Sequence, residues 1–155
     1  MIVILMGVAG AGKTTVVRRL ARELGWRFVD GDDCHPRANI DKMTRGIPLA
    51  DKDRTPWLQR LRGSIERCSR DGRSAVIACS ALTQAYRDYL SVDVGGVRFV
   101  YLKGEYELIR ERLKGRRGHF AKEDLLASQL KTLEEPEGVL TVDAAQDQIG
   151  RASCR

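Results

Sequence analysis

The sequence lacks the features of a secreted, membrane-spanning or zinc-binding protein. Its four cysteines are scattered without a CxxC pair, and only two histidines are present. This spacing disfavours structural zinc and suits reduced thiols in a cytoplasmic protein. The apolar start, MIVILM, has no basic region before it and runs into glycines, so we expect no signal peptide. No apolar run is long enough to span a bilayer.

Blocks of basic residues are also missing. The net charge is +6, yet the arginines are spread along expected helices, and no basic stripe with interleaved aromatics is present. We therefore expect no nucleic-acid or membrane partner, and an anionic small substrate explains the charge at least as well. Binding of RNA or phosphorylation of a polynucleotide end stays open as an alternative, which a steep loss of binding with salt would support.

Short apolar runs alternate with segments of helical periodicity. The chain is 155 residues long and 43% hydrophobic, which predicts one domain over residues 1–155. Nearly all-apolar strands separated by helices predict an α/β fold, a five-stranded parallel sheet with helices on both faces. The expected strands are 2–5, 26–29, 74–79, 97–102 and 139–142. A further helix is expected to start at Thr55-Pro56.

A glycine-rich motif, GVAGAGKT, follows the first expected strand at residues 7–14 and precedes a helix. It matches GxxxxGK[ST] in the strand–helix context of a P-loop, whose backbone N–H groups face a phosphate chain. Lys13 is expected to reach the β and γ phosphates of ATP, and the Thr14 hydroxyl to ligate Mg²⁺. The nucleotide-binding prediction covers Gly7, Gly10, Ala11, Gly12, Lys13, Thr14 and Thr15.

Two acids follow the second expected strand. The third strand ends in Cys79-Ser80 instead of the usual magnesium-shell acid, whereas Asp30 and Asp32 stand at the end of the second. Both would lie at the carboxyl edge of the sheet, beside the P-loop. One carboxylate can serve magnesium through water, and the other can meet an acceptor hydroxyl. Zinc held by Asp32, Cys34 and His35 is the competing interpretation.

Longer motifs resemble the gluconokinase family. The segments DGDDCHPRANIDKMTRGIPLADKDRTPWL, IACSALTQAYRDYL, YLKG and RLKGRRGHF occur in that family's order, and the resemblance covers residues 2 to about 143. It implies the fold of shikimate and nucleoside monophosphate kinases, and transfer of the ATP γ-phosphate to the 6-hydroxyl of D-gluconate with Mg²⁺. It also implies a possible homodimer. A shikimate-like or nucleoside acceptor, and nucleotide binding without turnover, stay open as alternatives.

Within that resemblance, residues 32–60 or thereabouts would bind the acceptor. Asp32 would orient the 6-hydroxyl and accept its proton, and Asp30 would act through magnesium water. His35, Asn39 and Lys42 recur at helical spacing and could line the pocket, and Ser80 could bond a substrate hydroxyl. Arg54 and Arg87 are both candidates for the gluconate carboxylate, and the sequence does not choose between them.

The basic turn RLKGRRGHF resembles an adenylate kinase lid. Arg112 and Arg116 have the spacing at which one arginine stacks on adenine and the next contacts the phosphates. Arg116 would stabilise the transferring phosphoryl group, and a lid over about 114–122 would exclude water. Residues 144–155 depart from the family pattern, because they lack the apolar stripe of its last helix.

Overall fold

The computed structural model describes residues 1–114 and 123–145 of the chain. Its centre is a five-stranded sheet in the order β2-β3-β1-β4-β5, and every neighbouring pair is parallel. The predicted strands are confirmed with small shifts at their ends. They are β1 (Ile2–Met6), β2 (Arg27–Asp30), β3 (Ala75–Ala78), β4 (Val97–Lys103) and β5 (Leu140–Asp143).

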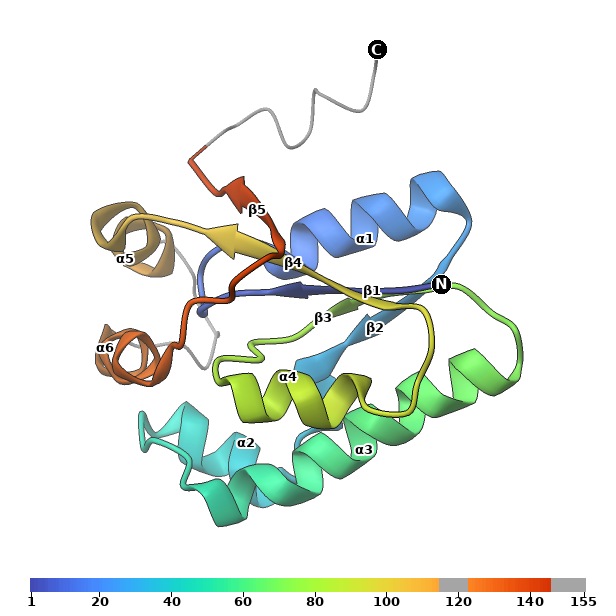
Figure 1. Ribbon diagram of the computed structural model, residues 1–155. Helices are drawn as coiled ribbons and strands as arrows, with labels where there is room; N and C mark the ends of the chain where they lie inside the picture. The colour runs from blue at the N-terminus through green and yellow to red at the C-terminus, as the bar shows by residue number, and fades with distance from the viewer. Residues whose placement is uncertain (115–122, 146–155) are drawn as a thin grey trace.

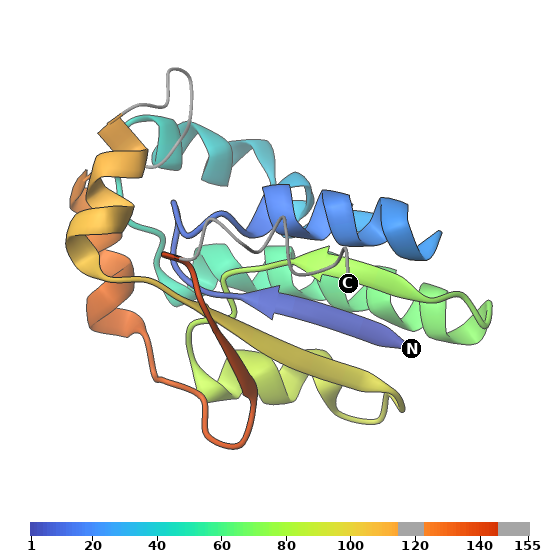
Figure 2. The ribbon, with the colours of Figure 1, turned by 90° about the horizontal axis from the view of Figure 1, so that it is seen from above.

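Helices cover both faces of this sheet, as predicted (Figure 1). One face carries α1 and the other carries α3 and α4, while α5 and α6 stand beyond the carboxyl ends of the central strands (Figures 1 and 2). The helices are α1 (Lys13–Leu24), α2 (Arg37–Thr44), α3 (Asp51–Arg70), α4 (Gln84–Ser91), α5 (Tyr106–Lys114) and α6 (Glu123–Thr132). A short 3₁₀ turn, η1 (Gly31–Cys34), follows β2.

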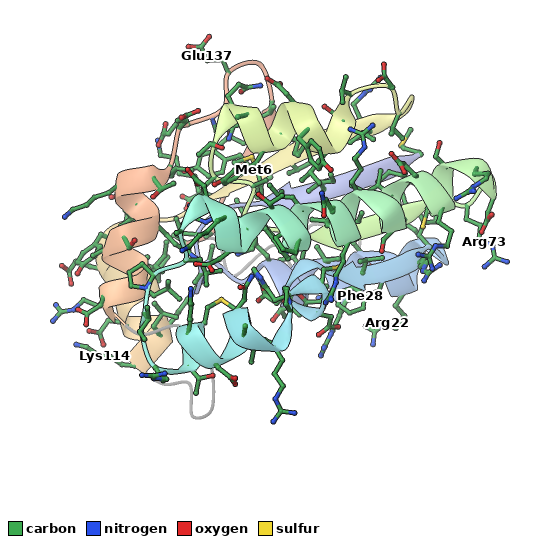
Figure 3. The ribbon with its side chains drawn as sticks, turned by 90° about the horizontal axis from the view of Figure 1, so that it is seen from below. Met6, Arg22, Phe28, Arg73, Lys114 and Glu137 are labelled. Carbon is green, nitrogen blue, oxygen red and sulfur yellow. The ribbon has the colours of Figure 1, made fainter. Side chains whose placement is uncertain are left out.

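Alternation along the strands divides the core into two layers, because successive side chains of a strand point to opposite faces. Ile2, Ile4 and Met6 of β1 pack with α3 and α4, whereas Leu5 packs with α1, α5 and α6. Figure 3 shows Met6 in the interior, while Arg22, Arg73, Lys114 and Glu137 extend outward at the periphery. Hydrophobic burial on both faces is therefore what holds this sheet in place.

The predicted start of the third helix was wrong. α3 begins at Asp51, and Pro56 lies inside it. The Asp53 carboxylate accepts a hydrogen bond from the backbone N–H of Ala50 at 2.9 Å, which satisfies a donor at the helix start. This acidic first turn begins the helix before the proline, so Thr55 and Pro56 lie inside α3.

The sheet register brings the carboxyl ends of three strands together. Ala78 of β3 is opposite both Leu5 of β1 and Asp30 of β2. The loops that follow β1, β2 and β3 therefore leave the sheet at one level and side by side. In the part of the chain that the structure describes, no helix combines the length and apolar character needed to cross a bilayer.

Candidate active site

The loop after β1 is shaped by glycines that no other residue could replace without strain. Gly7 and Gly10 have φ angles of 143° and 83°, in the region that favours glycine. A Cβ atom on Gly7 would lie 2.6 Å from the Leu102 carbonyl oxygen, and one on Gly10 would lie 2.8 Å from Leu113 Cγ. The loop then enters α1 at Lys13, whose Nζ donates to the Val8 carbonyl at 2.9 Å.

The acids after β2 lie against this loop. Thr14 Oγ1 donates to Asp30 Oδ2 at 3.2 Å, and Asp30 Oδ1 accepts from the backbone N–H of Asp32 at 3.1 Å. The second bond caps η1 and turns the chain at the sheet edge. A hydroxyl and a carboxylate that touch each other are the hard oxygen donors that suit Mg²⁺. The side chains at this edge fit that ion.

A cavity of about 100 Å³ lies where these loops meet. It brings together cations from the P-loop and α3 with acids from β2 and η1, so it suits an anionic ligand that also carries hydroxyl groups. Of the predicted residues, those that line it are Gly10, Gly12, Lys13, Thr14, Asp30, Asp32, His35, Arg54 and Ser80. Those that do not are Gly7, Ala11, Thr15, Asn39, Lys42, Arg87 and Arg112. Arg116 lies outside the described residues, as do residues 115–122 of the lid predicted at about 114–122 and residues 146–155 of the atypical segment 144–155.

Arg54 reaches the cavity from α3 and is held in a small polar cluster. Its Nη1 donates to Asp51 Oδ1 and to the Tyr86 hydroxyl, both at 3.2 Å. Tyr86 in turn donates to Asp51 Oδ1 at 2.8 Å. Burial and the hydrogen bond to Asp51 raise the pKa of Tyr86, so its hydroxyl stays protonated. Tyr86 lines the cavity and was missed at the sequence level, although it stands beside Arg87 in the quoted CSALTQAYR segment.

Arg87 has a different environment. The side chain is buried, and its Nη1 donates to the carbonyls of Ala81 and Leu82 at 3.0 and 3.2 Å. Its Nε and Nη2 donate to Gln84 Oε1. Ala81 has a φ of 41°, so the guanidinium holds a strained turn just after Ser80. Arg87 shapes the loop that carries Ser80 and does not line the cavity.

Asn39 and Lys42 lie on α2, and both are directed toward Asp53. Lys42 Nζ forms an ion pair with Asp53 Oδ1 at 2.7 Å, and Asn39 Nδ2 donates to the Asp53 carbonyl at 2.7 Å. The predicted short helix does not include His35, which lies between η1 and α2, but it does hold Asn39 and Lys42. What the spacing could not show is that their polar groups join α2 to α3.

His35 is buried between these elements and lines the cavity. Its ring stacks on Trp57 with the ring centroids 4.8 Å apart and an interplanar angle of 8°. Burial, together with the nearby Arg54 charge, lowers the pKa of His35 to about 4. The imidazole is therefore neutral near pH 7. Trp57 donates from Nε1 to the Gly31 carbonyl at 2.7 Å, which ties α3 to η1.

The zinc interpretation finds no support in residues 1–114 and 123–145. No group of three or more histidine, cysteine or acidic side chains in those ranges is arranged to hold a metal. Burial raises the pKa of the Cys34 thiol, and it raises that of Cys79 to about 12. Both thiols are therefore protonated near pH 7.

Two contacts tie the P-loop to elements later in the chain. Arg112 Nη1 donates to the Ala11 carbonyl at 3.3 Å, and its Nη2 donates to the Ala144 carbonyl at 2.7 Å. Gln129 of α6 accepts a hydrogen bond from the Ala9 N–H at 2.7 Å and lines the cavity. Gln129 carries no signal in the sequence, because only the fold brings α6 to the loop after β1.

Comparisons with known proteins show what the chain is similar to. A family model described as AAA domain matches residues 2–136. The thermoresistant gluconokinase of Escherichia coli K12 is 46% identical over 153 residues, which cover 96% of this chain and 87% of that protein.

Solved structures of two sugar kinases are also similar to this chain. A gluconokinase from Sinorhizobium meliloti 1021 has a TM-score of 0.80 at 43% identity, covering 93% of this chain and 82% of that one. A sugar kinase from Janibacter sp. HTCC2649 has a TM-score of 0.88 at 42% identity, covering 96% and 88%. A shikimate kinase from Aquifex aeolicus, 16% identical with a TM-score of 0.64, shares the fold and covers 94% and 88%.

Proposed function

Because the chain belongs to the gluconokinase family, we propose that it transfers the γ-phosphoryl group of ATP to the 6-hydroxyl of D-gluconate. One observation carries this proposal: the P-loop, the two acids after β2, and Arg54 with Tyr86 line the same cavity. Phosphoryl transfer needs positioning and charge stabilisation at such a place. A chain with a P-loop alone would indicate a nucleotide and leave the acceptor unspecified.

The P-loop residues would hold the nucleotide. The backbone N–H groups of the P-loop and the positive end of the α1 dipole favour the negative charge of the phosphates. Lys13 now donates to the Val8 carbonyl and would turn to the β and γ phosphates. Arg112 stays the predicted adenine-side residue, and its bonds to the Ala11 and Ala144 carbonyls hold it beside the P-loop. Arg116 stays a predicted phosphate contact from outside the described residues.

Thr14 and Asp30 would hold Mg²⁺, Thr14 directly and Asp30 through water, in keeping with their hard oxygen donors. When bound, the ion neutralises charge on the phosphates. Asp32 would orient the gluconate 6-hydroxyl and accept its proton. The hydroxyl oxygen then forms a bond to the γ-phosphorus as the bond to the β-phosphate oxygen breaks, which yields 6-phosphogluconate and ADP.

The acceptor would occupy the side of the cavity lined by α3 and α4. Arg54, held by Asp51 and Tyr86, can meet the carboxylate through its planar fork. His35 and Ser80 can bond hydroxyl groups. Asn39, Lys42 and Arg87 were predicted as direct ligands, and we now propose supporting roles for them, because their polar groups already bind protein atoms. A cytoplasmic location and a homodimer stay predictions.

The test is ADP release from ATP and Mg²⁺ with D-gluconate, shikimate, a nucleoside monophosphate or no acceptor. We expect turnover with gluconate alone, and a fall in kcat of about 10²- to 10⁴-fold in Asp32→Asn. The matched control is Asp33→Asn, since Asp33 is the adjacent exposed acid and does not line the cavity. Equal activity of both variants would show that Asp32 has no catalytic role. Turnover with another acceptor would show that gluconate is not the substrate.

A further inference from the structure

The hydrogen bonds around Asn39 determine which nitrogen of His35 carries a proton. Asn39 is 3% exposed, and its Nδ2 lies 2.7 Å from the Asp53 carbonyl oxygen and 3.1 Å from His35 Nδ1. A backbone carbonyl can only accept, so the atom facing it must be the amide nitrogen. An amide nitrogen only donates, and its second hydrogen is directed at His35 Nδ1. Nδ1 must therefore be the unprotonated, accepting nitrogen.

The other ring nitrogen, Nε2, is the one left for a ligand. His35 lines the cavity, Nδ1 is engaged by Asn39, and within the described residues no protein group bonds to Nε2. The ring cannot rotate away, because it stacks on Trp57, which is itself fixed by its bond to the Gly31 carbonyl. Burial and the Arg54 guanidinium on α3 both oppose a second proton on the ring.

We propose that Asn39 is a positioning residue that locks His35 as the neutral Nε2–H tautomer, so that His35 presents one uncharged donor to a gluconate oxygen. This inference rests on the proposed function only for the identity of the acceptor. A polyhydroxy carboxylate offers many oxygens that accept, and a fixed donor selects one orientation of the chain of hydroxyls. An uncharged donor does so without competing with Arg54 for the carboxylate.

The tautomer can be read directly by nuclear magnetic resonance of the ¹⁵N-labelled full chain. The sequence has two histidines, so the imidazole spectrum holds two sets of signals, and His35→Gln removes one and assigns both. At pH 7 we expect a protonated Nε2 and an unprotonated Nδ1 for His35. A protonated Nδ1 in the unmodified protein would overturn the proposal without any appeal to activity.

Asn39→Asp tests the lock itself. A carboxylate at this place can only accept, so the Nδ1 signal should change to the protonated form. Gln59→Glu is the matched control, because it makes the same amide-to-acid change on an exposed part of α3 and should leave the His35 signals in place. An unchanged Nδ1 in folded Asn39→Asp would mean that Asn39 does not set the tautomer.

Kinetics test the donor. His35→Gln retains an uncharged N–H donor and should keep the gluconate KM within about threefold, whereas His35→Leu should raise it about tenfold, the value of one hydrogen bond. The ATP KM should stay within about twofold in both variants. Equal gluconate KM values for folded His35→Gln and His35→Leu would exclude the donor role. A parent protein with the expected tautomer but no gluconate-dependent ADP release would instead contradict the proposed function.

Discussion

At the residue scale, two arginines that the sequence could not separate differ in what their guanidinium groups already bind. Arg54 lines the cavity beside Asp51 and Tyr86, while Arg87 donates to backbone carbonyls. We therefore expect Arg54→Lys to raise the gluconate KM about tenfold or more, because an ammonium cannot make two parallel bonds to a carboxylate. The ATP KM should change little, and steady-state kinetics with each substrate varied will measure both. An unchanged gluconate KM would show that Arg54 does not bind the gluconate carboxylate.

Arg87→Met should instead destabilise the fold. It leaves the buried Ala81 carbonyl without its donor, at a cost of about 1–3 kcal/mol, whereas the Leu82 carbonyl still accepts from the Glu134 N–H. Urea unfolding measures the loss, with Arg70→Met at the exposed end of α3 as the control. If Arg87→Met raised the gluconate KM with no loss of stability, the guanidinium would bind substrate after all.

At the element scale, the P-loop packs so closely on α5 that only a residue without a Cβ atom fits at position 10. A Cβ on Gly10 would meet Ile109 and Leu113, and its φ is unfavourable for other residues. Gly10→Ala should cost about 1–3 kcal/mol of unfolding free energy and weaken ATP binding. Calorimetry of unfolding and of ATP binding measures the two effects.

Gly63 provides the opposite case within α3. It has open space around its Cα and lies in the helix interior. Gly63→Ala should stabilise the protein by about 0.5–1 kcal/mol, since alanine loses less backbone entropy on folding. The same unfolding measurement serves for both variants. A loss of stability in Gly63→Ala would show that the α3 surface is covered by something else.

The elements themselves were largely predictable, because apolar runs of strand length alternate with helical stripes. The strand order was not, since it depends on crossovers that no local pattern encodes. The sequence identified Lys13, Thr14, Asp30 and Asp32 through the strand ends on which they stand. It could not identify Tyr86 or Gln129 as cavity residues, because their side chains reach the cavity only through the packing of α4 and α6. The sequence also did not reveal the capping bond of Asp53, with which α3 starts at Asp51, five residues before Pro56.

At the scale of the whole molecule, burial of neutral His35 links folding to pH. Its pKa is about 4 in the folded state against about 6.5 when unfolded, so the unfolded chain binds more protons between those values. Stability should fall as pH drops from about 6.5 toward 4, by up to about 3 kcal/mol from this group. Urea unfolding from pH 7.5 to 4.5 measures the free energy of unfolding at each pH. This free energy should fall less steeply with falling pH in His35→Gln than in the unmodified protein. Equal slopes would mean that other groups account for the pH dependence.

The stack of His35 on Trp57 gives the molecule an optical probe of its own cavity. The chain has two tryptophans, and Trp26 lies at the opposite end of β2, away from the cavity lining. In Trp26→Phe the remaining indole emission would come from Trp57 alone. Its intensity should change when a ligand binds beside the imidazole, so unlabelled protein can report occupancy of the acceptor site in a stopped-flow fluorimeter before any phosphate has moved.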